Sequence, residues 1–489
     1  MQIIGVDLGS TNLKAALYTE SFELLGRESA PVEYYRAGPV VEFDAEDYCA
    51  ALKDTLKRLL CVPGAKPAEV AQIVFTGQAE SLVVLGGDGK PLMRAISWMD
   101  ERSVEECDEL AAKFDGKLCE AVTGQQAVLS TWPATKILWL KHNRPEIYSA
   151  AKTYMLLKDY IVYCLTGVKQ SDCSIATFSF YFNIYEKKYW KEMLDAIGIS
   201  ESQLPPLAEP CTVAGCLTKA VAAELGLPVS AEVNHGTLDH FTGMIGTGNV
   251  QPGGVSLSTG TVMALATMAK APVTDRNCGI AMHYGFIPGT HIMLPVAESG
   301  GVSLEWFRRS CMPDVDYGKL NAVLDSREHP TSVIFLPYIV GTNSPEFDKR
   351  ASGVFFGLRS EHDAYDMAAA VMEGVACLLR KNCDAMKRKG AEVGYIIATG
   401  GGAKSNIWCQ MQADITGVPV VRPAEMEAAC LGSAMIGAVC AGKYASFEEA
   451  AKVAVRMERR FEPRENPDYE RLYKKFCALY EATVQIADI

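Results

Sequence analysis

The chain has 489 residues, of which 49% are hydrophobic and 22% are charged, and its formal net charge is −12. This length exceeds one ordinary hydrophobic core, so two large domains are expected. The negative balance, without a block of basic residues, argues against a nucleic-acid surface, and no apolar run reaches the roughly 20 residues needed to span a bilayer.

The sixteen cysteines contain no Cys-x-x-Cys pair, and those that fall within predicted helices and strands behave as small hydrophobic residues. The chain starts directly on a predicted strand, so no signal peptide is expected. A disulfide framework is not expected without secretion. The sequence therefore predicts a cytoplasmic protein that binds neither nucleic acid nor membrane.

A strand–turn–strand unit opens the chain. Residues 2–6 and 13–18 are rich in strand-forming residues. The turn between them places hydroxyl, amide and backbone donors, followed by an amine, where phosphate groups could be bound: Ser10, Thr11, Asn12 and Lys14. Asp7 at the end of the first strand is a candidate Mg²⁺ ligand, directly or through water. An ordinary hairpin is the alternative, although a hairpin requires only the glycine.

The next elements alternate between helix and strand. Residues 43–62 predict a helix with Asp44 as its N-cap and an apolar stripe of Tyr48, Leu52, Leu56, Leu59 and Leu60. Residues 72–75 predict a strand. Residues 116–141 predict a loop followed by a helix, whose two tryptophans either line a substrate pocket or pack the core.

One carboxylate, Asp239, lies within a glycine-rich run that extends from Gly236 to Gly248. Glycine permits close approach of the backbone to a ligand, and an acid there can accept the proton of an attacking hydroxyl. An ordinary turn is the alternative. His235 and His240 are five residues apart, which is not a one-face helical spacing, so a transition metal is disfavoured and His240 is a candidate hydrogen-bond partner of the substrate.

A loop-forming stretch at 246–254 predicts a domain boundary, with domains at 1–246 and 247–489. Directly after it, predicted strands at 255–257 and 262–266 flank a second turn of the same kind, with residues Ser258, Thr259, Gly260 and Thr261. This unit repeats the first about 250 residues later, which indicates duplication of a whole domain.

A third glycine-rich turn follows a predicted strand at 395–399. It comprises Gly400, Gly401 and Gly402, with Lys404 next and Asn406 at the start of a predicted helix. A helix N-terminus beside glycine backbone would suit the adenosine and α-phosphate of a nucleotide. The remaining predictions are strands at 333–336 and 418–421 and helices at 365–388, 427–441 and 466–489. The Ala- and Gly-rich helix 427–441 either packs closely on a neighbour or leaves room for a nucleotide.

Several longer motifs, in this order, resemble the FGGY family of carbohydrate kinases over essentially the whole chain. The stretches 5–12 and 258–261 resemble its phosphate motifs, 95–102 its substrate segment, 133–143 its first signature, and 353–358 with 366–373 its second. Leu157-Lys158-Asp159-Tyr160 favours the xylulose kinase-like branch. The resemblance implies an α/β fold with two ribonuclease H-like domains, as in actin-like ATPases, and an interdomain cleft.

The resemblance also implies ATP and Mg²⁺, with Asp7 and Asp239 at the metal. Asp239 is then the general base that lets a primary hydroxyl of a small sugar, a pentulose of the xylulose or ribulose type, accept a phosphoryl group. The predicted substrate contacts are Gln78, Ala79, Glu80, Trp98, Asp100, Asp239 and His240. A homodimer is compatible with this family.

Two alternatives remain open from the sequence. Gln78 and Glu80 follow the glycerol kinase pattern, with Ala79 in place of its arginine, so the substrate of such a kinase can instead be glycerol, another short polyol or a tetrulose. From a different class, the chain can be a sugar-independent conformational ATPase or a catalytically silent sugar-binding protein.

Overall fold

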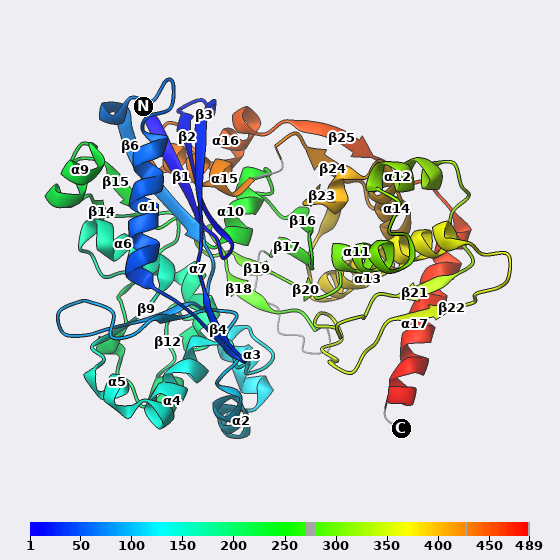
Figure 1. Ribbon diagram of the computed structural model, residues 1–489, viewed down its shortest axis with the longest axis horizontal. Helices are drawn as coiled ribbons and strands as arrows, with labels where there is room; N and C mark the ends of the chain where they lie inside the picture. The colour runs from blue at the N-terminus through cyan, green and yellow to red at the C-terminus, as the bar shows by residue number, and fades with distance from the viewer. Residues whose placement is uncertain (270–278, 426–427, 488–489) are drawn as a thin grey trace. The chain divides into compact units, whose positions relative to one another are not determined.

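The computed structural model describes residues 1–269, 279–425 and 428–487 (Figure 1). They form two compact units. Each is discontinuous in sequence, whereas the predicted division was a single cut between residues 246 and 247. The first unit comprises Met1–Val250, Met282–His291 and Glu427–Val455, and the second comprises Gln251–Ala281, Ile292–Met426 and Arg456–Ile489. Glu427, predicted as the first residue of a helix, lies outside the described residues.

A six-stranded sheet forms the centre of the first unit. In order across the sheet, the strands are β14 (Val213–Cys216), β15 (Glu232–Asn234), β6 (Val70–Gly77), β1 (Gln2–Leu8), β2 (Asn12–Thr19) and β3 (Leu24–Pro31). β1, β6 and β15 run parallel to one another, and β2 and β3 continue as an antiparallel meander. Ile3, Ile4, Val6 and Leu8 are fully buried, as expected for a strand covered on both faces.

A second sheet and a set of helices complete the first unit. The sheet contains β4 (Tyr35–Ala37), β5 (Val40–Phe43), β8 (Ala95–Ile96), β7 (Leu82–Leu85) and β9 (Thr153–Leu156). Shorter strands are β10 (Ser171–Asp172), β11 (Phe182–Asn183), β12 (Lys188–Tyr189), β13 (Leu207–Ala208), β18 (Met282–Tyr284) and β19 (His291–Met293), the last of which crosses into the second unit's residues. The helices are α1 (Ala45–Leu59), α2 (Val104–Lys113), α3 (Gly116–Thr123), α4 (Pro133–Asn143), α5 (Pro145–Ala150), α6 (Leu157–Thr166), α7 (Cys173–Ala176), α8 (Lys191–Ile197), α9 (Lys219–Leu225), α10 (Asp239–Gly246), α15 (Ala428–Cys440) and α16 (Phe447–Ala454).

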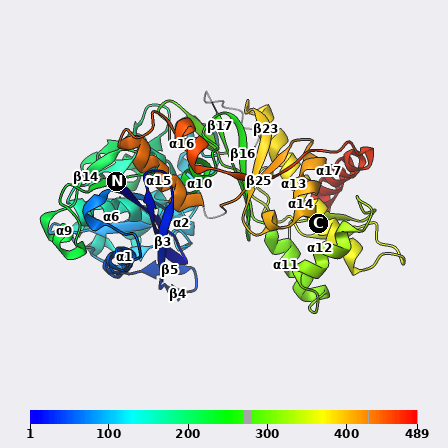
Figure 2. The same cartoon turned by 90° about the horizontal axis from the view of Figure 1, so that it is seen from above.

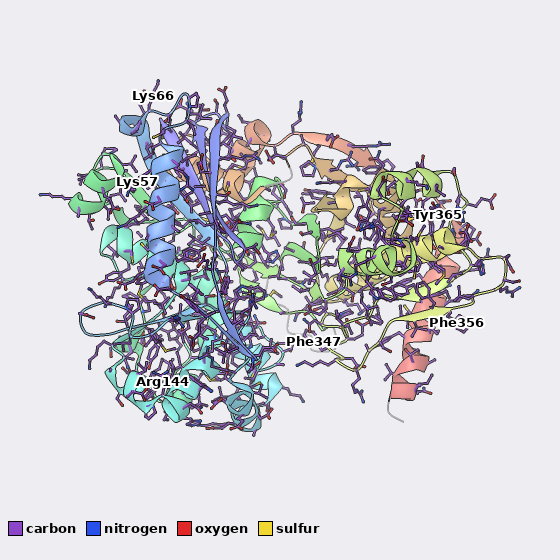
Figure 3. All side chains as sticks on the ribbon, in the orientation of Figure 1. Lys57, Lys66, Arg144, Phe347, Phe356 and Tyr365 are labelled. Carbon is purple, nitrogen blue, oxygen red and sulfur yellow. The ribbon has the colours of Figure 1, made fainter. Side chains whose placement is uncertain are left out.

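Helix α1 confirms the predicted cap and stripe. The Asp44 carboxylate accepts hydrogen bonds from the backbone N–H groups of Glu46 and Asp47, which satisfies donors left open at a helix start. Its apolar side chains join one buried cluster with β1, α6 and α9. At the surface, Lys57 pairs with Glu224 of α9 (Lys57 is labelled in Figure 3).

Helix α15 packs at backbone distance against β1 and α10, and its place beside α10 can be followed in Figures 1 and 2. A Cβ added at Gly5 would lie 2.4 Å from the carbonyl oxygen of Cys430, and one at Gly432 would lie 2.0 Å from that of Thr242. Only glycine fits such contacts. The prediction of close packing is therefore confirmed, and the neighbours of this helix belong to the first unit.

The second unit has a central sheet with the same strand pattern. Across it lie β17 (Met263–Ala269), β16 (Gly253–Thr259), β23 (Val393–Thr399), β24 (Val420–Pro423) and β25 (Met457–Phe461), with β20 (Val296–Ala297) paired to β17. β16, β23 and β24 are parallel, and β17 is antiparallel to β16. This order repeats that of β2, β1, β6 and β15, in agreement with the predicted duplication.

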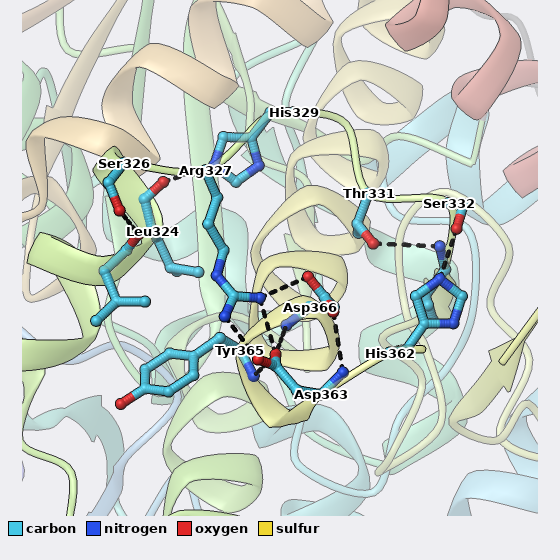
Figure 4. A network of polar contacts seen from close by, with 12 residues as sticks. Leu324, Ser326, Arg327, His329, Thr331, Ser332, His362, Asp363, Tyr365 and Asp366 are labelled. Carbon is cyan, nitrogen blue, oxygen red and sulfur yellow. Dashed lines mark hydrogen bonds and ion pairs between the residues drawn. The ribbon is translucent and has the colours of Figure 1, made fainter. Parts of the chain in front are cut away.

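The helices of the second unit are α11 (Gly301–Cys311), α12 (Tyr317–Asp325), α13 (Ala364–Arg388), α14 (Asn406–Thr416) and α17 (Pro467–Ala487), and a small hairpin joins β21 (Ile334–Leu336) to β22 (Val354–Phe356). Asp363 caps α13 and forms a reciprocal capping box with Asp366. Arg327 donates hydrogen bonds to both carboxylates (Figure 4). Asp366, a residue of the second signature, and Asp363 thus connect the start of α13 to Arg327.

One local prediction was wrong. The start of the stretch 116–141 is helix α3 rather than a loop. Asp115 caps this helix by accepting from the Leu118 N–H, and Gly124 ends it in the left-handed region, which are the ordinary signals for a helix start and stop. Of the two tryptophans, Trp132 is buried and stacks on Phe180, so it packs the core.

Two general expectations can also be compared with the structure. Among the described residues, no helix combines the length and apolarity needed to cross a bilayer. No disulfide bond joins the cysteines that the structure describes.

Candidate active site

The predicted catalytic and substrate residues gather at one edge of the first unit's central sheet. Because β1, β6 and β15 are parallel, their carboxyl ends meet at the same edge. The chain leaves β1 into the Ser10–Asn12 turn, leaves β6 into Gln78–Glu80, and leaves β15 into the loop before Asp239. Ligands of open α/β sheets bind beyond the carboxyl ends of the strands.

Asp239 is the first residue of α10 and is half-buried. The preceding loop is tightly placed, because Gly236 has φ +59° and a Cβ there would lie 1.8 Å from the carbonyl oxygen of Phe75. The Thr76 hydroxyl also donates to the carbonyl of Thr237 at 2.8 Å. The Asp239 carboxylate accepts from the backbone N–H of the exposed His240 at 2.6 Å. The carboxylate is therefore held at the edge and open to a ligand.

Asp7 lies on the sheet face that α15 covers. Side chains alternate along a strand, and Gly5 contacts α15, so Asp7 two residues later points to the same side. The half-buried Asp7 precedes a turn in which Thr11 and Asn12 are exposed. The indole N–H of Trp98, a predicted substrate contact, donates to the Ser10 hydroxyl at 2.8 Å. The hairpin and the substrate segment are thus in direct contact.

The segment Gln78–Glu80 has an unusual backbone. Glu80 adopts φ +64°, which costs energy for a residue with a side chain. The Gln78 side chain accepts a hydrogen bond from the Ser81 hydroxyl at 2.7 Å. Burial raises the pKa of Glu80 to about 7, against the attraction of Lys136 and a hydrogen bond with Thr131, both of which lower it.

Lys136, which the sequence analysis did not single out within the stretch 133–143, links two parts of the site. Its fully buried ammonium donates to the carbonyls of Glu80 at 3.2 Å and Ser97 at 2.8 Å, so it ties the two predicted substrate segments together. Burial lowers its pKa, and Glu80 and Asp100 oppose that shift. Its position within an apolar helical stretch was the available signal, because a buried lysine requires a partner.

Asp100 corrects the predicted substrate set. Its carboxylate has no exposed surface. It accepts two hydrogen bonds from Arg102, at 2.8 and 2.6 Å, and one from the Val41 N–H at 2.6 Å. Arg102 also pairs with Glu42 at 2.8 Å. With these donors around a buried carboxylate, Asp100 anchors the substrate segment to β5 rather than accepting sugar hydroxyls.

In the second unit, the predicted phosphate residues also meet at the carboxyl edge of the sheet. The Gly260 carbonyl at the hairpin turn accepts from the Gly301 N–H of α11 at 2.7 Å. Gly400 has φ +79°, and a Cβ there would lie 2.9 Å from the carbonyl oxygen of Thr259. A Cβ at Gly402 would lie 2.8 Å from the Cβ of Thr259. The two turns therefore fit only with glycine at the contact.

These turns line a pocket of about 450 Å³. The predicted residues that line it are Thr259, Gly260, Thr261, Gly401, Gly402 and Lys404. Asn406 instead accepts from Arg422 at 3.0 Å. The rest of the wall was missed by sequence reasoning and comes largely from α11 and α12: Gly301, Val302, Leu304, Glu305, Tyr317, Asn321, Ser405 and Trp408. The Gly300–Gly301 pair was the available signal.

Two domain profiles decide the family. The N-terminal domain of the FGGY family of carbohydrate kinases matches residues 2–246, and the C-terminal domain of the same family matches residues 255–441. The chain belongs to the FGGY family of carbohydrate kinases. It is therefore a carbohydrate kinase of a family that uses ATP, it acts on a small-molecule sugar, and its α/β architecture is the two-domain, actin-like ATPase fold.

Known relatives of this FGGY kinase differ in substrate. It is 29% identical over 488 residues to a xylulose kinase from Staphylococcus epidermidis, covering 99% of this chain and 97% of the relative. It is 26% identical over 492 residues to a gluconokinase from Bacillus licheniformis, covering 98% and 94%. The crystal structure of a xyloylose kinase from Brucella ovis superposes with a TM-score of 0.93 at 29% identity, covering 99% of this chain and all of that one.

Proposed function

We propose that this FGGY kinase transfers the γ-phosphoryl group of ATP to a primary hydroxyl of a pentulose of the xylulose or ribulose type, with Asp239 as general base. The observation that carries the proposal is the place of Asp239: half-buried, at the start of α10, after a loop held by Gly236 and Thr76. The nearly full-length similarity to xylulose kinases supports the choice of sugar.

The Asp239 carboxylate suits proton acceptance from a hydroxyl. It lies at the N-terminus of a helix, where the helix dipole stabilises negative charge. Phosphoryl transfer depends mainly on positioning and on stabilising charge, and a general base contributes about 10²–10⁴-fold. The carboxylate would orient the sugar hydroxyl and take its proton as the oxygen–phosphorus bond forms.

The residues of each unit fit one part of MgATP. In the second unit, the glycine contacts with Thr259 and the 450 Å³ pocket suit a nucleotide, with Lys404 and backbone N–H groups near its phosphates. In the first unit, Asp7 and Asp239 supply the carboxylate oxygens that Mg²⁺ prefers. When bound, Mg²⁺ would neutralise negative charge on the phosphoryl group during its transfer.

The charge of the first edge favours a neutral sugar over gluconate. Asp7, Glu80 and Asp239 place three carboxyl groups at the edge, and the buried Lys136 ammonium is directed at two backbone carbonyls. A carboxylate on the substrate would meet like charge there, whereas sugar hydroxyls can donate to these oxygens. Because some relatives are gluconokinases, the assay must compare gluconate with neutral sugars.

Sugar-dependent release of ADP tests the proposal. The purified chain is given MgATP with D- and L-xylulose, D- and L-ribulose, tetruloses, glycerol and gluconate, and ADP is followed with a coupled assay. A pentulose that raises turnover by orders of magnitude supports the proposal. Best turnover with gluconate or glycerol would replace the substrate, and sugar-independent ADP release would contradict the proposed transfer.

A further inference from the structure

A buried ion pair lies next to the loop that precedes Asp239. Lys158, in the first turn of α6, pairs with Asp172 at the end of β10, and neither side chain has exposed surface. The Lys158 ammonium also donates to the carbonyl of His235 at 2.9 Å. Burying two charges is costly unless each is paired and hydrogen-bonded, so this pair requires its partners in place.

The same carboxylate connects to the loop by a second route. Asp172 accepts from the backbone N–H of Ser174 at 2.9 Å and from the Ser174 hydroxyl. The Ser174 hydroxyl oxygen in turn accepts from the hydroxyl of Thr237 at 2.7 Å. A continuous chain of hydrogen bonds therefore runs from Lys158 through Asp172 and Ser174 to Thr237.

The two routes reach the loop on either side of Gly236. His235 is held through its carbonyl by Lys158, and Thr237 is held through its hydroxyl by Ser174 and through its carbonyl by Thr76. Gly236 between them takes the left-handed conformation, φ +59°. Asp239 follows two residues after Thr237, so the place of its carboxylate depends on these anchors.

The buried polar side chains around Asp172 could instead bind a metal ion, but the charges there argue against this role. Ligand atoms of Asp159, Asp172 and His235 lie within 4.8 Å of one another. However, the Lys158 ammonium already contacts Asp172. A divalent cation would then be placed beside a buried positive charge, which costs energy.

We propose that Lys158, Asp172 and Ser174 are positioning residues that fix the 235–238 loop and so the place of the Asp239 carboxylate. The inference rests on the proposed role of Asp239 as general base. It assigns a catalytic consequence to residues that touch neither sugar nor nucleotide in this scheme. A displacement of about 1 Å at a reacting group can cost about 10²-fold in rate.

The decisive variant is Thr237→Val, because Lys158→Met would leave Asp172 buried and unpaired and can unfold the chain. Thr237→Val removes the last hydrogen bond of the chain with little change in shape. Thr55→Val in α1 is the matched control, since Thr55 is also fully buried and its hydroxyl donates to a local carbonyl at 2.8 Å. We expect kcat to fall by about 10–100-fold in Thr237→Val, with the KM for ATP unchanged, and Thr55→Val to keep wild-type values.

Two further readouts separate positioning from simple destabilisation. In an Asp239→Asn background, Thr237→Val should reduce kcat by no more than about 3-fold, because residues that act as a unit are not additive. Hydrogen exchange of the peptide 234–241, measured without ligands, should quicken in Thr237→Val but not in Thr55→Val. The positioning role would be overturned if kcat were unchanged in Thr237→Val. It would also be overturned if Thr237→Val reduced kcat as much in the Asp239→Asn background as in the wild type.

The exchange measurement also keeps the two proposals distinguishable. If the wild-type chain shows no sugar-dependent ADP release, the proposed function has failed, and unchanged exchange in Thr237→Val would show separately that these bonds do not hold the loop. If added Zn²⁺ raises the melting temperature and Asp159→Asn abolishes that rise, the cluster is a metal site and the positioning role is overturned.

Discussion

The two central sheets are built alike and carry different chemistry. In each, an antiparallel hairpin adjoins a set of parallel strands, β2 with β1, β6 and β15 in the first unit and β17 with β16, β23 and β24 in the second. The carboxyl edge of the first sheet presents Asp7, Glu80 and Asp239. The edge of the second presents hydroxyl groups, glycines and Lys404.

This difference shows how a repeated fold can divide one reaction. Carboxylates at the first edge can bind hydroxyls and metal and accept a proton. Glycine backbone and a lysine at the second edge can surround phosphates. Function is thus set by the side chains placed at an edge, and the strand order only brings them together.

The largest expected effect comes from the first edge. Asp239→Asn keeps the shape of the side chain but removes its capacity to accept the proton of the sugar hydroxyl. We expect kcat to fall by about 10²–10⁴-fold, while the Kd for ATP, measured by calorimetry, stays within about 2-fold of wild type because phosphates are held elsewhere. Turnover at the wild-type rate would remove Asp239 from the mechanism.

A smaller effect is expected at the second edge, where a substitution should weaken ATP binding without changing the phosphoryl-transfer step. Gly400→Ala forces a Cβ to within 2.9 Å of the Thr259 carbonyl at φ +79°, which displaces the phosphate turn. We expect the Kd for ATP to rise about 10-fold, which corresponds to about 1.4 kcal/mol.

Gly417→Ala provides the control for this variant. Gly417 also has a positive φ, +67°, but no atom lies within 4 Å of its added Cβ. It should therefore lose stability without losing affinity for ATP. Equal loss of affinity in both variants would show that backbone strain, and not the contact with Thr259, is responsible.

Glu80→Gln probes the sugar. Burial raises the pKa of Glu80 to about 7. If Glu80 contacts the sugar, as the sequence predicts, its ionised form would accept sugar hydroxyls above that pH and would be lost as the pH falls. The sugar KM of the wild type should therefore rise as the pH falls from 8 to 6, by up to about 10-fold. The variant should have a raised KM that does not vary over this range, and Glu109→Gln on the exposed face of α2 should behave as wild type. A pH-dependent KM in Glu80→Gln would assign the titration to another group.

The smallest effect on catalysis is expected at Glu373, where the change concerns stability alone; its partner His329 is labelled in Figure 4. Burial raises the pKa of Glu373 to about 7, against a hydrogen bond with His329 that lowers it. The folded state then binds more protons than the unfolded state between about pH 4.5 and 7. Stability should fall by about 1–3 kcal/mol as the pH rises from about 4.5 to 7, and Glu373→Gln should flatten this decline in urea unfolding curves. An equally steep decline in the variant would contradict the role of Glu373.

Local patterns predicted most elements because their signals lie within a few residues. The β1–β2 hairpin follows from strand-forming residues around a polar turn, and α1 from a cap followed by a regular apolar stripe. Helix α3 was missed although Asp115 and Gly124 mark its ends. A helix of 8 residues makes only about two turns, which is too short for its apolar period to be distinguished from a loop in sequence.

Long-range contacts set the limits of sequence prediction at the site. From the sequence alone, Asp100 is predicted to bind substrate hydroxyls. Its contacts with Val41 and Arg102, which occupy the carboxylate, are known only from the structure. The role of Lys136 depends on two carbonyls that are about 40 and 56 residues away. The residues at the sheet edges could be identified because strand ends converge, whereas their partners across the fold could not.

The contact of α15 with β1 has a consequence for how the chain is made. Gly5 allows backbone-distance packing between the beginning of the chain and a helix that starts at residue 428. In a nascent chain that has reached residue 250, one face of β1 and β6 is therefore still uncovered. The helix that covers it, α15, is synthesised about 180 residues later. Such late partners slow folding and expose apolar surface. The first unit completes its core only after most of the second has been synthesised, so a chain truncated near residue 250 should aggregate rather than fold as a separate sugar-binding domain.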